Sequence, residues 1–196
     1  MPGAMNLPAA SAPASARTRI LDAAERIVQA KGVGGLTLAA AASEAGVSKG
    51  GLLYHFASKE ALIAGMLDRY AEFVSASFDA TVARQAEGRG RVARAIIAWA
   101  FGEEETSPGS EPIDRLAAVC LAAFHHDPAL LDPMRAVAAR MKAELLADGT
   151  PAGPALAVLT ASDGLFMAHI FGLYRHGEAE RAALRATLEA LLEPPG

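Results

Sequence analysis

The sequence predicts an all-α protein in which a few short N-terminal helices precede a larger helical domain. Of its 196 residues 52% are hydrophobic but only 6% are aromatic, a composition that suits close-packed helices better than a sheet of β-branched and aromatic residues. Apolar residues recur at steps of three and four along most of the chain, and no strand-like alternation competes with them. Glycine-containing breaks separate these segments and divide the chain into helices.

The first predicted helix runs from Arg17 to Gly32, where a glycine ends the apolar pattern. Thr37 is a candidate N-cap for a second helix that ends at Gly46, a residue free to adopt the positive φ of a helix terminus. Ser48 is placed to cap a short third helix. These three helices form the first predicted group.

A fourth predicted helix begins after Ser58 and runs past Tyr70 towards Val82, with Glu60 in its first turn, where the helix dipole favours an acid. The polar, glycine-containing stretch 83–91 separates these helices from the rest of the chain. Further helices are expected after it, joined by an exposed and mobile acidic loop at 103–112.

The C-terminal half is predicted to hold two proline-initiated helix starts and two long helices. Asp127-Pro128 and Asp132-Pro133 each have the form of an N-cap followed by proline at the first helical position. A long apolar helix is expected from about Ala155 to Arg175, followed by a last helix near 180–192. The sequence thus predicts a flexible tail at 1–16, a first domain at 17–62 and a second at 63–196.

Several features point to a protein of the cytoplasm. The segment 1–16 lacks the positive n-region and long apolar core of a signal peptide, and no later run is long and uninterrupted enough to predict a membrane span. Cys120 is the single cysteine, so the fold cannot depend on an intramolecular disulfide. We therefore expect a cytoplasmic location and no membrane partner.

Charge is distributed unevenly along the chain. The formal net charge of −4 argues against a nucleic-acid partner, because binding to DNA depends on neutralising phosphates. From Arg17 to Tyr70, however, seven Lys/Arg stand against five Asp/Glu, a net +2, which leaves −6 for the remainder. Between Glu44 and Glu60 there are two lysines and no acid. This pattern is typical of a small DNA-binding domain attached to a larger domain with another task.

The second and third helices, separated by the tight turn Ala-Gly-Val-Ser, have the arrangement of a helix-turn-helix, whose later helix lies in the major groove. Hydroxyl, ammonium and imidazole groups gather there, and a glycine allows close approach to base edges. The candidate DNA-binding residues are Thr37, Ser48, Lys49, Gly50, Tyr54, His55 and Lys59. The alternatives are a plain N-cap for Thr37 and a solvated polar face for Lys49, Tyr54, His55 and Lys59.

On these residues the chain resembles the TetR family of regulators. The resemblance covers residues 17–67 and matches the family pattern in identity and spacing. The matching residues are Gly32, Thr37, Leu38, Ala42, Ala45, Gly46, Val47, Ser48, Phe56, Ser58, Lys59, Glu60 and Leu62. The chain departs from the pattern at Leu53, where many members carry a tyrosine, and at Gly51, where Thr or Ala is common. No phosphate contact is therefore assigned to Leu53, and the operator sequence cannot be deduced.

The resemblance implies a C-terminal domain that binds a small molecule and pairs two subunits. Met, Cys and aromatic residues on several predicted helix faces could form an adaptable apolar pocket with an occasional polar anchor. The candidate ligand-binding residues are Trp99, Cys120, Phe124, Met134, Met141, Phe166 and His169. Ordinary core packing is the alternative for each.

Two apolar faces near the C-terminus predict a four-helix interface between two copies, with a two-fold axis that matches a palindromic operator. One is a strip of small residues and the other a leucine stripe. Their members are Gly164, Ala168, Gly172, Leu184, Leu188 and Leu191. Packing within a single chain is the alternative.

Other chemistry finds little support in the sequence. His125, His126 and Asp127 are neighbours and so point to different sides of a helix, and no partner recurs at metal-ligand spacing. The chain contains no nucleophile elbow, phosphate-binding glycine loop or zinc-protease motif. We therefore expect no enzyme activity, no metal and no cofactor.

The sequence predicts a dimeric repressor that leaves a palindromic operator when a small-molecule effector binds the C-terminal domain. A helical enzyme or ligand carrier with a merely structural N-terminal cap, and an activator with the same DNA-binding domain, are the alternatives.

Overall fold

The computed structural model describes residues 15–102 and 111–193, apart from the side chains of three residues within them, Glu111, Ala122 and His125. The described part is helical, as predicted, and contains no strand. Its elements are α1 (Ala16–Lys31), η1 (Val33–Gly35, a 3-10 turn), α2 (Leu38–Glu44), α3 (Lys49–His55), α4 (Lys59–Arg84), α5 (Arg91–Phe101), α6 (Glu111–His126), η2 (Pro128–Leu131, a 3-10 turn), α7 (Asp132–Ala147), α8 (Ala152–Phe171) and α9 (Glu178–Ala190).

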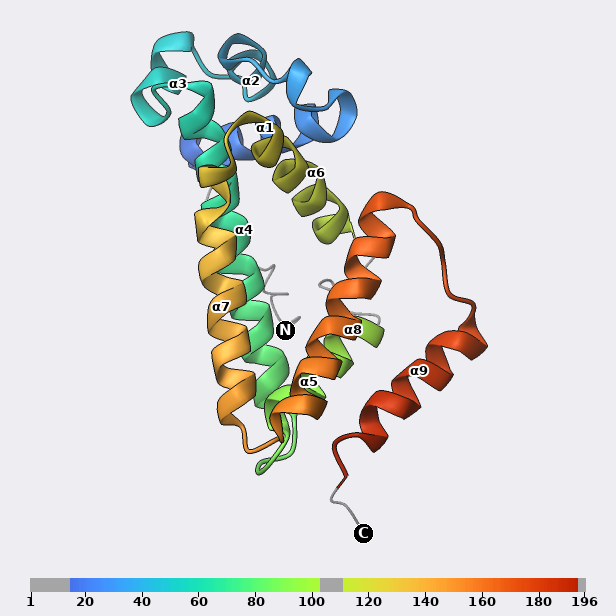
Figure 1. Cartoon of the computed structure of the whole chain (residues 1–196). Coiled ribbons are helices and arrows are strands. Elements are labelled where there is room, and N and C mark those ends of the chain that lie inside the picture. Colours follow the sequence, from blue (N-terminus) through green and yellow to red (C-terminus); the bar gives the residue numbers. More distant parts are fainter. Residues whose placement is uncertain (1–14, 103–110, 194–196) are drawn as a thin grey trace, which may run out of the picture.

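Helices α1 to α3 form a compact head at one end of the long helix α4 (Figure 1). The head surrounds apolar side chains with almost no exposure, including Ile20, Leu36 and Leu52. A glycine in α4 permits the close fit of head and body: a Cβ atom at Gly65 would lie 2.7 Å from the Phe56 ring. Phe56 can therefore pack directly against the backbone of α4.

Two clusters of buried side chains stabilise the molecule, and the first joins head and body. It combines the core of α1 to α3 with residues of α4 and with Ile113, Leu116, Val119 and Ala123 of α6. The second cluster lies farther from the head, around Phe78, and draws on α4, α5, α7, α8 and α9. Because α6 belongs to the head's own core, a movement of α6 is expected to reach the head.

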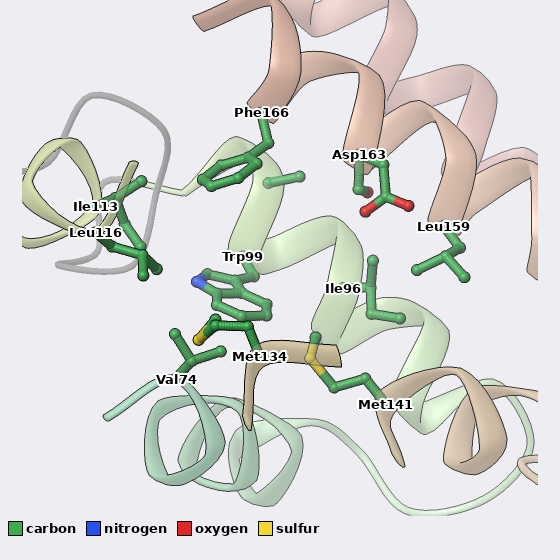
Figure 2. A pocket seen from close by; sticks show the side chains of 12 residues that line it. Val74, Ile96, Trp99, Ile113, Leu116, Met134, Met141, Leu159, Asp163 and Phe166 are labelled. Carbon is green, nitrogen blue, oxygen red and sulfur yellow. The ribbon is translucent and has the colours of Figure 1, made fainter. Parts of the chain in front are cut away.

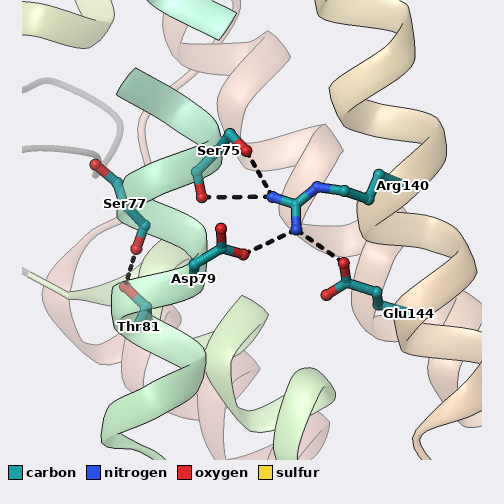
Figure 3. A network of polar contacts seen from close by, with 6 residues as sticks. All are labelled: Ser75, Ser77, Asp79, Thr81, Arg140 and Glu144. Atoms are coloured by element: carbon teal, nitrogen blue, oxygen red, sulfur yellow. Dashed lines mark hydrogen bonds and ion pairs between the residues drawn. The ribbon is translucent and has the colours of Figure 1, made fainter. Parts of the chain in front are cut away.

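A polar network fixes α7 against α4 (Figure 3). The guanidinium of Arg140 donates to Asp79 and to Glu144, each at 2.8 Å, and to the hydroxyl and carbonyl oxygens of Ser75 at 2.8 and 3.4 Å. The guanidinium also lies 5.5 Å from the centre of the Phe78 ring. Arg140 thereby sets the position of α7.

The structure corrects several details of the predicted elements. Ser15 caps α1 and Ala16 is its first residue, so the last two residues of the predicted tail belong to the start of this helix. Residues 1–14 and most of the predicted mobile loop lie outside the described residues. Asp127 caps η2 as expected, but Asp132 is the first residue of α7 and caps nothing with its side chain. No break occurs in α4 at the predicted domain boundary, so one helix belongs to both domains.

The long apolar helix α8 also differs from its prediction. It ends at Phe171 instead of near Arg175, because Gly172 adopts a left-handed conformation with φ of 59°. By length and composition alone α8 passes the test for a membrane span, a test that the core helix of a globular fold also passes. In the fold it packs against α5, α7 and α9, and this packing accounts for the apolar residues on its inner side.

Candidate DNA-binding surface and ligand cavity

Helix α3 presents most of its surface to solvent. Leu52 is its one buried residue, while Tyr54 is 86% exposed and Lys49 and Gly50 are also exposed. A short helix that is anchored by a single buried leucine and has an open polar face can enter a DNA groove without unfolding. The apolar side chain of Leu53, next to Leu52, is 40% exposed, and no DNA contact is assigned to it.

Two of the candidate residues with a hydroxyl group, Thr37 and Ser48, are N-caps. Thr37 Oγ1 accepts a bond of 3.0 Å from the amide of Ala40, and Ser48 Oγ accepts one of 3.0 Å from the amide of Gly51. A hydroxyl that accepts a cap bond still has its own proton to donate. Capping is therefore compatible with a phosphate contact at either residue.

Gly50 and the aromatic pair at the end of α3 complete this surface. A Cβ atom at Gly50 would meet no atom of the protein within 4 Å, so internal packing does not require glycine there. The rings of Tyr54 and His55 meet edge to face with centroids 5.1 Å apart, and His55 is half-buried. This contact restricts the tyrosine ring on the outer face of the helix.

Lys59 has a structural partner within the head. Its ammonium group donates to the carbonyl oxygen of Val33 at 2.7 Å and so joins the start of α4 to η1. The ammonium has further protons for a phosphate, but the prediction from sequence did not foresee this bond.

The acids at either end of the acid-free segment have partners. Glu44 forms an ion pair of 3.1 Å with Arg26, and Glu60 accepts a bond of 2.7 Å from Nε2 of His126 on α6. Bonds from its own backbone amide and from Ser58, and then from His126, lower the pKa of Glu60 from 4.5 to about 2. These partners reduce the repulsion that the two carboxylates would exert on a phosphate backbone.

A cavity of about 180 Å³ lies in the body among α4, α5, α6, α7 and α8 (Figure 2). Its wall is mostly apolar, and the indole of Trp99 and the ring of Phe166 face the same space. The lining residues are Val74, Ile96, Trp99, Ala100, Ile113, Leu116, Met134, Met141, Leu159, Ser162, Asp163 and Phe166.

Four of the predicted ligand-binding residues line this cavity, namely Trp99, Met134, Met141 and Phe166. The other three lie elsewhere. Cys120 packs against the head's core, and burial raises the pKa of its thiol to about 11, while Phe124 is 63% exposed. Nε2 of His169 lies 2.6 Å from a carboxylate oxygen of Asp114, so His169 joins α8 to α6.

The remaining lining residues were not foreseen from the sequence. Aliphatic side chains such as Ile96 and Leu159 follow the same periodicity as any core residue, so only the fold shows which of them border a cavity. Asp163 could have been singled out from the sequence, because it is the one acidic or basic residue, histidine aside, in the apolar helix α8.

Helix α6 connects the cavity to the head. Ile113 and Leu116 line the cavity near one end of the helix, and both belong to the core shared with the head. At its other end, His126 bonds to Glu60 in the first turn of α4. A ligand that displaces Ile113 or Leu116 would therefore act on a helix that packs against α1 and holds the start of α4.

The predicted interface residues divide into two groups. Ala168 and Leu188 are 4% exposed and Leu184 packs into the second core cluster, so these three are used within one chain. Gly164 and Leu191 are exposed, and Gly172 is the exposed C-cap of α8 rather than a residue of the helix face. The leucine stripe of α9 thus faces mainly its own subunit.

An exposed apolar stripe does follow the outer side of α8. It includes Leu156 at 40% exposure, Met167 at 45% and Phe171 at 50%, with Gly164 between them. Exposed alanines follow α9 at helical spacing, and that helix lies at the edge of the body (Figure 1). The exposed alanines are Ala179, Ala182, Ala183, Ala186 and Ala190.

Comparison with known proteins matches both parts of the chain to models of one family. Residues 20–66 match the model described as bacterial regulatory proteins, tetR family, and residues 90–193 match the model of a tetracyclin repressor-like C-terminal domain. The head and the cavity-containing body therefore correspond to separately recognised domains.

Individual relatives agree with this match. The chain is 30% identical to the HTH-type transcriptional regulator BetI of Burkholderia lata over 82% of its own length and 81% of the relative. The structure of the multidrug binding protein EbrR complexed with ethidium aligns with a TM-score of 0.61 at 28% identity, covering 90% of this chain and 97% of that one. A TetR-family member from Streptomyces coelicolor A3 aligns with a TM-score of 0.60 at 30% identity over 92% of this chain and all of that one.

The fold and these matches define a DNA-binding transcriptional regulator with a ligand-binding C-terminal domain, and not an enzyme. The chain belongs to the TetR family.

Proposed function

We propose that this chain is a repressor that binds a two-fold operator through α3 and leaves it when a small molecule occupies the cavity. The observation that carries the proposal is the exposed polar face of α3 around Gly50. The core of the head that carries α3 continues into the wall of the cavity. The solved complex of EbrR with ethidium supports a small-molecule ligand for this type of body. We propose that the protein acts in the cytoplasm, where its operator DNA is.

The proposed contacts divide by role. Lys49 and Tyr54 project from α3 and are placed to contact base edges or phosphates, and His55 supports the Tyr54 ring. Thr37 and Ser48 donate their hydroxyl protons to phosphates while they cap their helices. Lys59 adds positive charge at the start of α4.

We propose that two copies pair through the outer stripe of α8 and the alanine face of α9. Contiguous apolar exposure of this kind marks a surface that another molecule covers, and small residues let helices approach closely. A two-fold pair would present both α3 helices to successive major grooves, about 34 to 36 Å apart on B-DNA.

Release of the operator requires that the ligand binds one arrangement of the dimer more tightly than the other. The structure favours α6 as the first helix to respond, since it lines the cavity with Ile113 and Leu116, whereas α4 contributes only Val74. Any shift of α6 would then reach α4 through the His126–Glu60 bond.

Replacing Lys49 or Tyr54 tests the DNA contact. Binding to the DNA that flanks the protein's own coding region should weaken by about tenfold or more for Lys49→Ala and Tyr54→Ala, as expected for a lost base or phosphate contact. Lys142→Ala removes an exposed lysine on α7 and should leave binding unchanged. Equal affinities for all three variants and the original protein would refute the assignment of α3.

Replacing one residue of the outer stripe tests the dimer. Met167→Glu should give a monomer in sedimentation experiments, because it places a charge within the proposed interface. Leu146→Glu changes an equally exposed residue, 43% accessible, on α7 and should leave the dimer intact. A Met167→Glu protein that remains dimeric would exclude this face.

A further inference from the structure

Among the described residues that line the cavity, one side chain is ionisable. Asp163 of α8 lies among aliphatic and aromatic neighbours, and its carboxylate points into the space that Trp99 and Phe166 border (Figure 2). Ser162 is the nearest polar residue in sequence, but its hydroxyl donates to the carbonyl oxygen of Val158 at 2.9 Å. Asp163 therefore supplies the only formal charge of the lining.

The carboxylate of Asp163 has no partner among the residues that the structure describes. Within the described part of the chain it takes part in no hydrogen bond or ion pair, and desolvation by its surroundings raises its pKa above the ordinary value of 3.8. Arg140 of α7 and His169 of α8 have partners of their own, since Arg140 bonds to α4 and Glu144, and His169 bonds to Asp114. The residue stays accessible to solvent, so an incoming molecule can reach it.

An unpaired carboxylate beside an apolar cavity favours a ligand with a positive charge. Partial desolvation of the carboxylate costs free energy that a cationic group would offset, and an aromatic face attracts a cation within about 6 Å of its centre. Trp99 and Phe166 offer such faces, and the sulfur atoms of Met134 and Met141 can adapt to an irregular apolar group.

We propose that the effector of this regulator is a small organic cation, whose charged group lies beside Asp163 and whose apolar part lies against Trp99 and Phe166. This inference rests on the proposed ligand-controlled function and identifies the chemical class of its ligand. Anionic effectors are disfavoured, because the carboxylate would repel them and the described lining residues include no cationic side chain.

The size of the cavity limits the ligand further. Its volume of about 180 Å³ is below the range of about 300 to 1,000 Å³ of most drug-sized ligand sites. A quaternary ammonium group with one ring suits this space without movement of the helices. A larger molecule would have to separate α6 from α8, which the bond between His169 and Asp114 resists.

The fluorescence of Trp99 provides a direct readout, because Trp99 is the single tryptophan of the chain and lines the cavity. The probe pair is phenyltrimethylammonium and tert-butylbenzene, which have the same shape and differ in charge. In titrations at pH 7 the cation should change Trp99 emission and raise the melting temperature with concentration, at least tenfold more tightly than the neutral compound.

Asp163→Asn keeps the shape of the side chain and removes its charge. This variant should bind the cation about tenfold more weakly and tert-butylbenzene unchanged. Asp68→Asn makes the same change at an exposed residue of α4 outside the lining and should bind both probes as the original protein does. The proposal is overturned if Asp163→Asn retains full affinity for the cation, or if the original protein binds the cation no better than the neutral probe or not at all.

Operator binding measured with the same samples separates this inference from the proposed function. Loss of cation binding with intact, specific DNA binding would overturn the ligand class alone. Cation binding through Asp163 without any effect on DNA affinity would support the ligand class and contradict release through α6.

Discussion

The head and the body of this protein are both helical, but the head presents an open polar surface and the body contains a cavity. The head buries apolar side chains of α1, α2 and α3 in its core and leaves a polar surface open, and its candidate binding residues lie within one stretch of sequence from Thr37 to Lys59. The body encloses a cavity whose wall comes from five helices spread between Val74 and Phe166. A local surface can be recognised from a run of sequence, whereas a cavity depends on which distant residues the fold brings together.

The two regions are not independent, because α6 belongs to the core of one and the cavity of the other. Helix α6 thus provides a physical link between the cavity and the proposed DNA-binding surface. If the head were a separate unit attached to the body by α4 alone, occupancy of the cavity would have little means of reaching the DNA-binding surface.

Truncating the anchor of α3 has the largest expected effect. Leu52→Ala should lower the free energy of unfolding by about 2 to 5 kcal/mol, because the fully buried leucine leaves a cavity in the core. Denaturant unfolding followed by circular dichroism should still show one transition, since head and body share that core. Leu53→Ala at the half-exposed neighbour should cost about 0.5 kcal/mol or less. Two separate transitions, only one of them shifted by Leu52→Ala, would show that the head folds alone.

A methyl group at Gly50 should separate stability from binding. Gly50→Ala has free space around it and should stabilise α3 by up to about 1 kcal/mol through its higher helix propensity. The same methyl group would obstruct close approach to the groove and weaken specific DNA binding by about tenfold. Thermal unfolding and anisotropy titration of the same preparation measure both effects. Unchanged DNA affinity would mean that this face of α3 does not enter the groove.

The hydrogen bonds and ion pairs of Arg140 in the body should contribute less to the free energy of unfolding. Arg140→Met keeps an apolar stem and removes the bonds to Asp79, Glu144 and Ser75, and we expect a loss of about 1 kcal/mol, since these groups are partly exposed. Arg135→Met is the matched control, because Arg135 pairs only with Asp132 one turn away. Urea denaturation measures the difference, and equal stabilities for the two variants would deny Arg140 its role in holding α7.

The Glu60 carboxylate at the start of α4 should produce the smallest effect, visible in acid. The folded pKa of Glu60 is lowered to about 2 from 4.5, so its contribution to stability is present above pH 4.5 and is lost as the pH falls towards 2. The difference in unfolding free energy between the original protein and Glu60→Gln should therefore shrink over that interval. A difference that stays constant between pH 5 and 2 would show that the carboxylate gains nothing from its own backbone amide, Ser58 and His126.

How much the sequence could reveal follows from the range of the interactions involved. Caps at Thr37, Ser48 and Ser58 were predictable because each acts on an amide three residues away. The bond from Lys59 to Val33 spans 26 residues and the one from His126 to Glu60 spans 66, and no local pattern signals either. Ala168, Leu184 and Leu188 pack within one chain, and the sequence could not show this for the same reason. Periodicity shows that Leu188 lies on an apolar face of its helix but not which helix covers that face.

The most direct test of the account compares binding of the purified protein to two duplexes at physiological salt. One carries the DNA that flanks its own coding region, and the other carries the same bases in scrambled order. If α3 recognises a specific operator, the protein should prefer the flanking duplex by about a thousandfold or more, as specific regulators do over random DNA. Equal affinities for the two duplexes, falling alike as salt is added, would contradict specific recognition by α3.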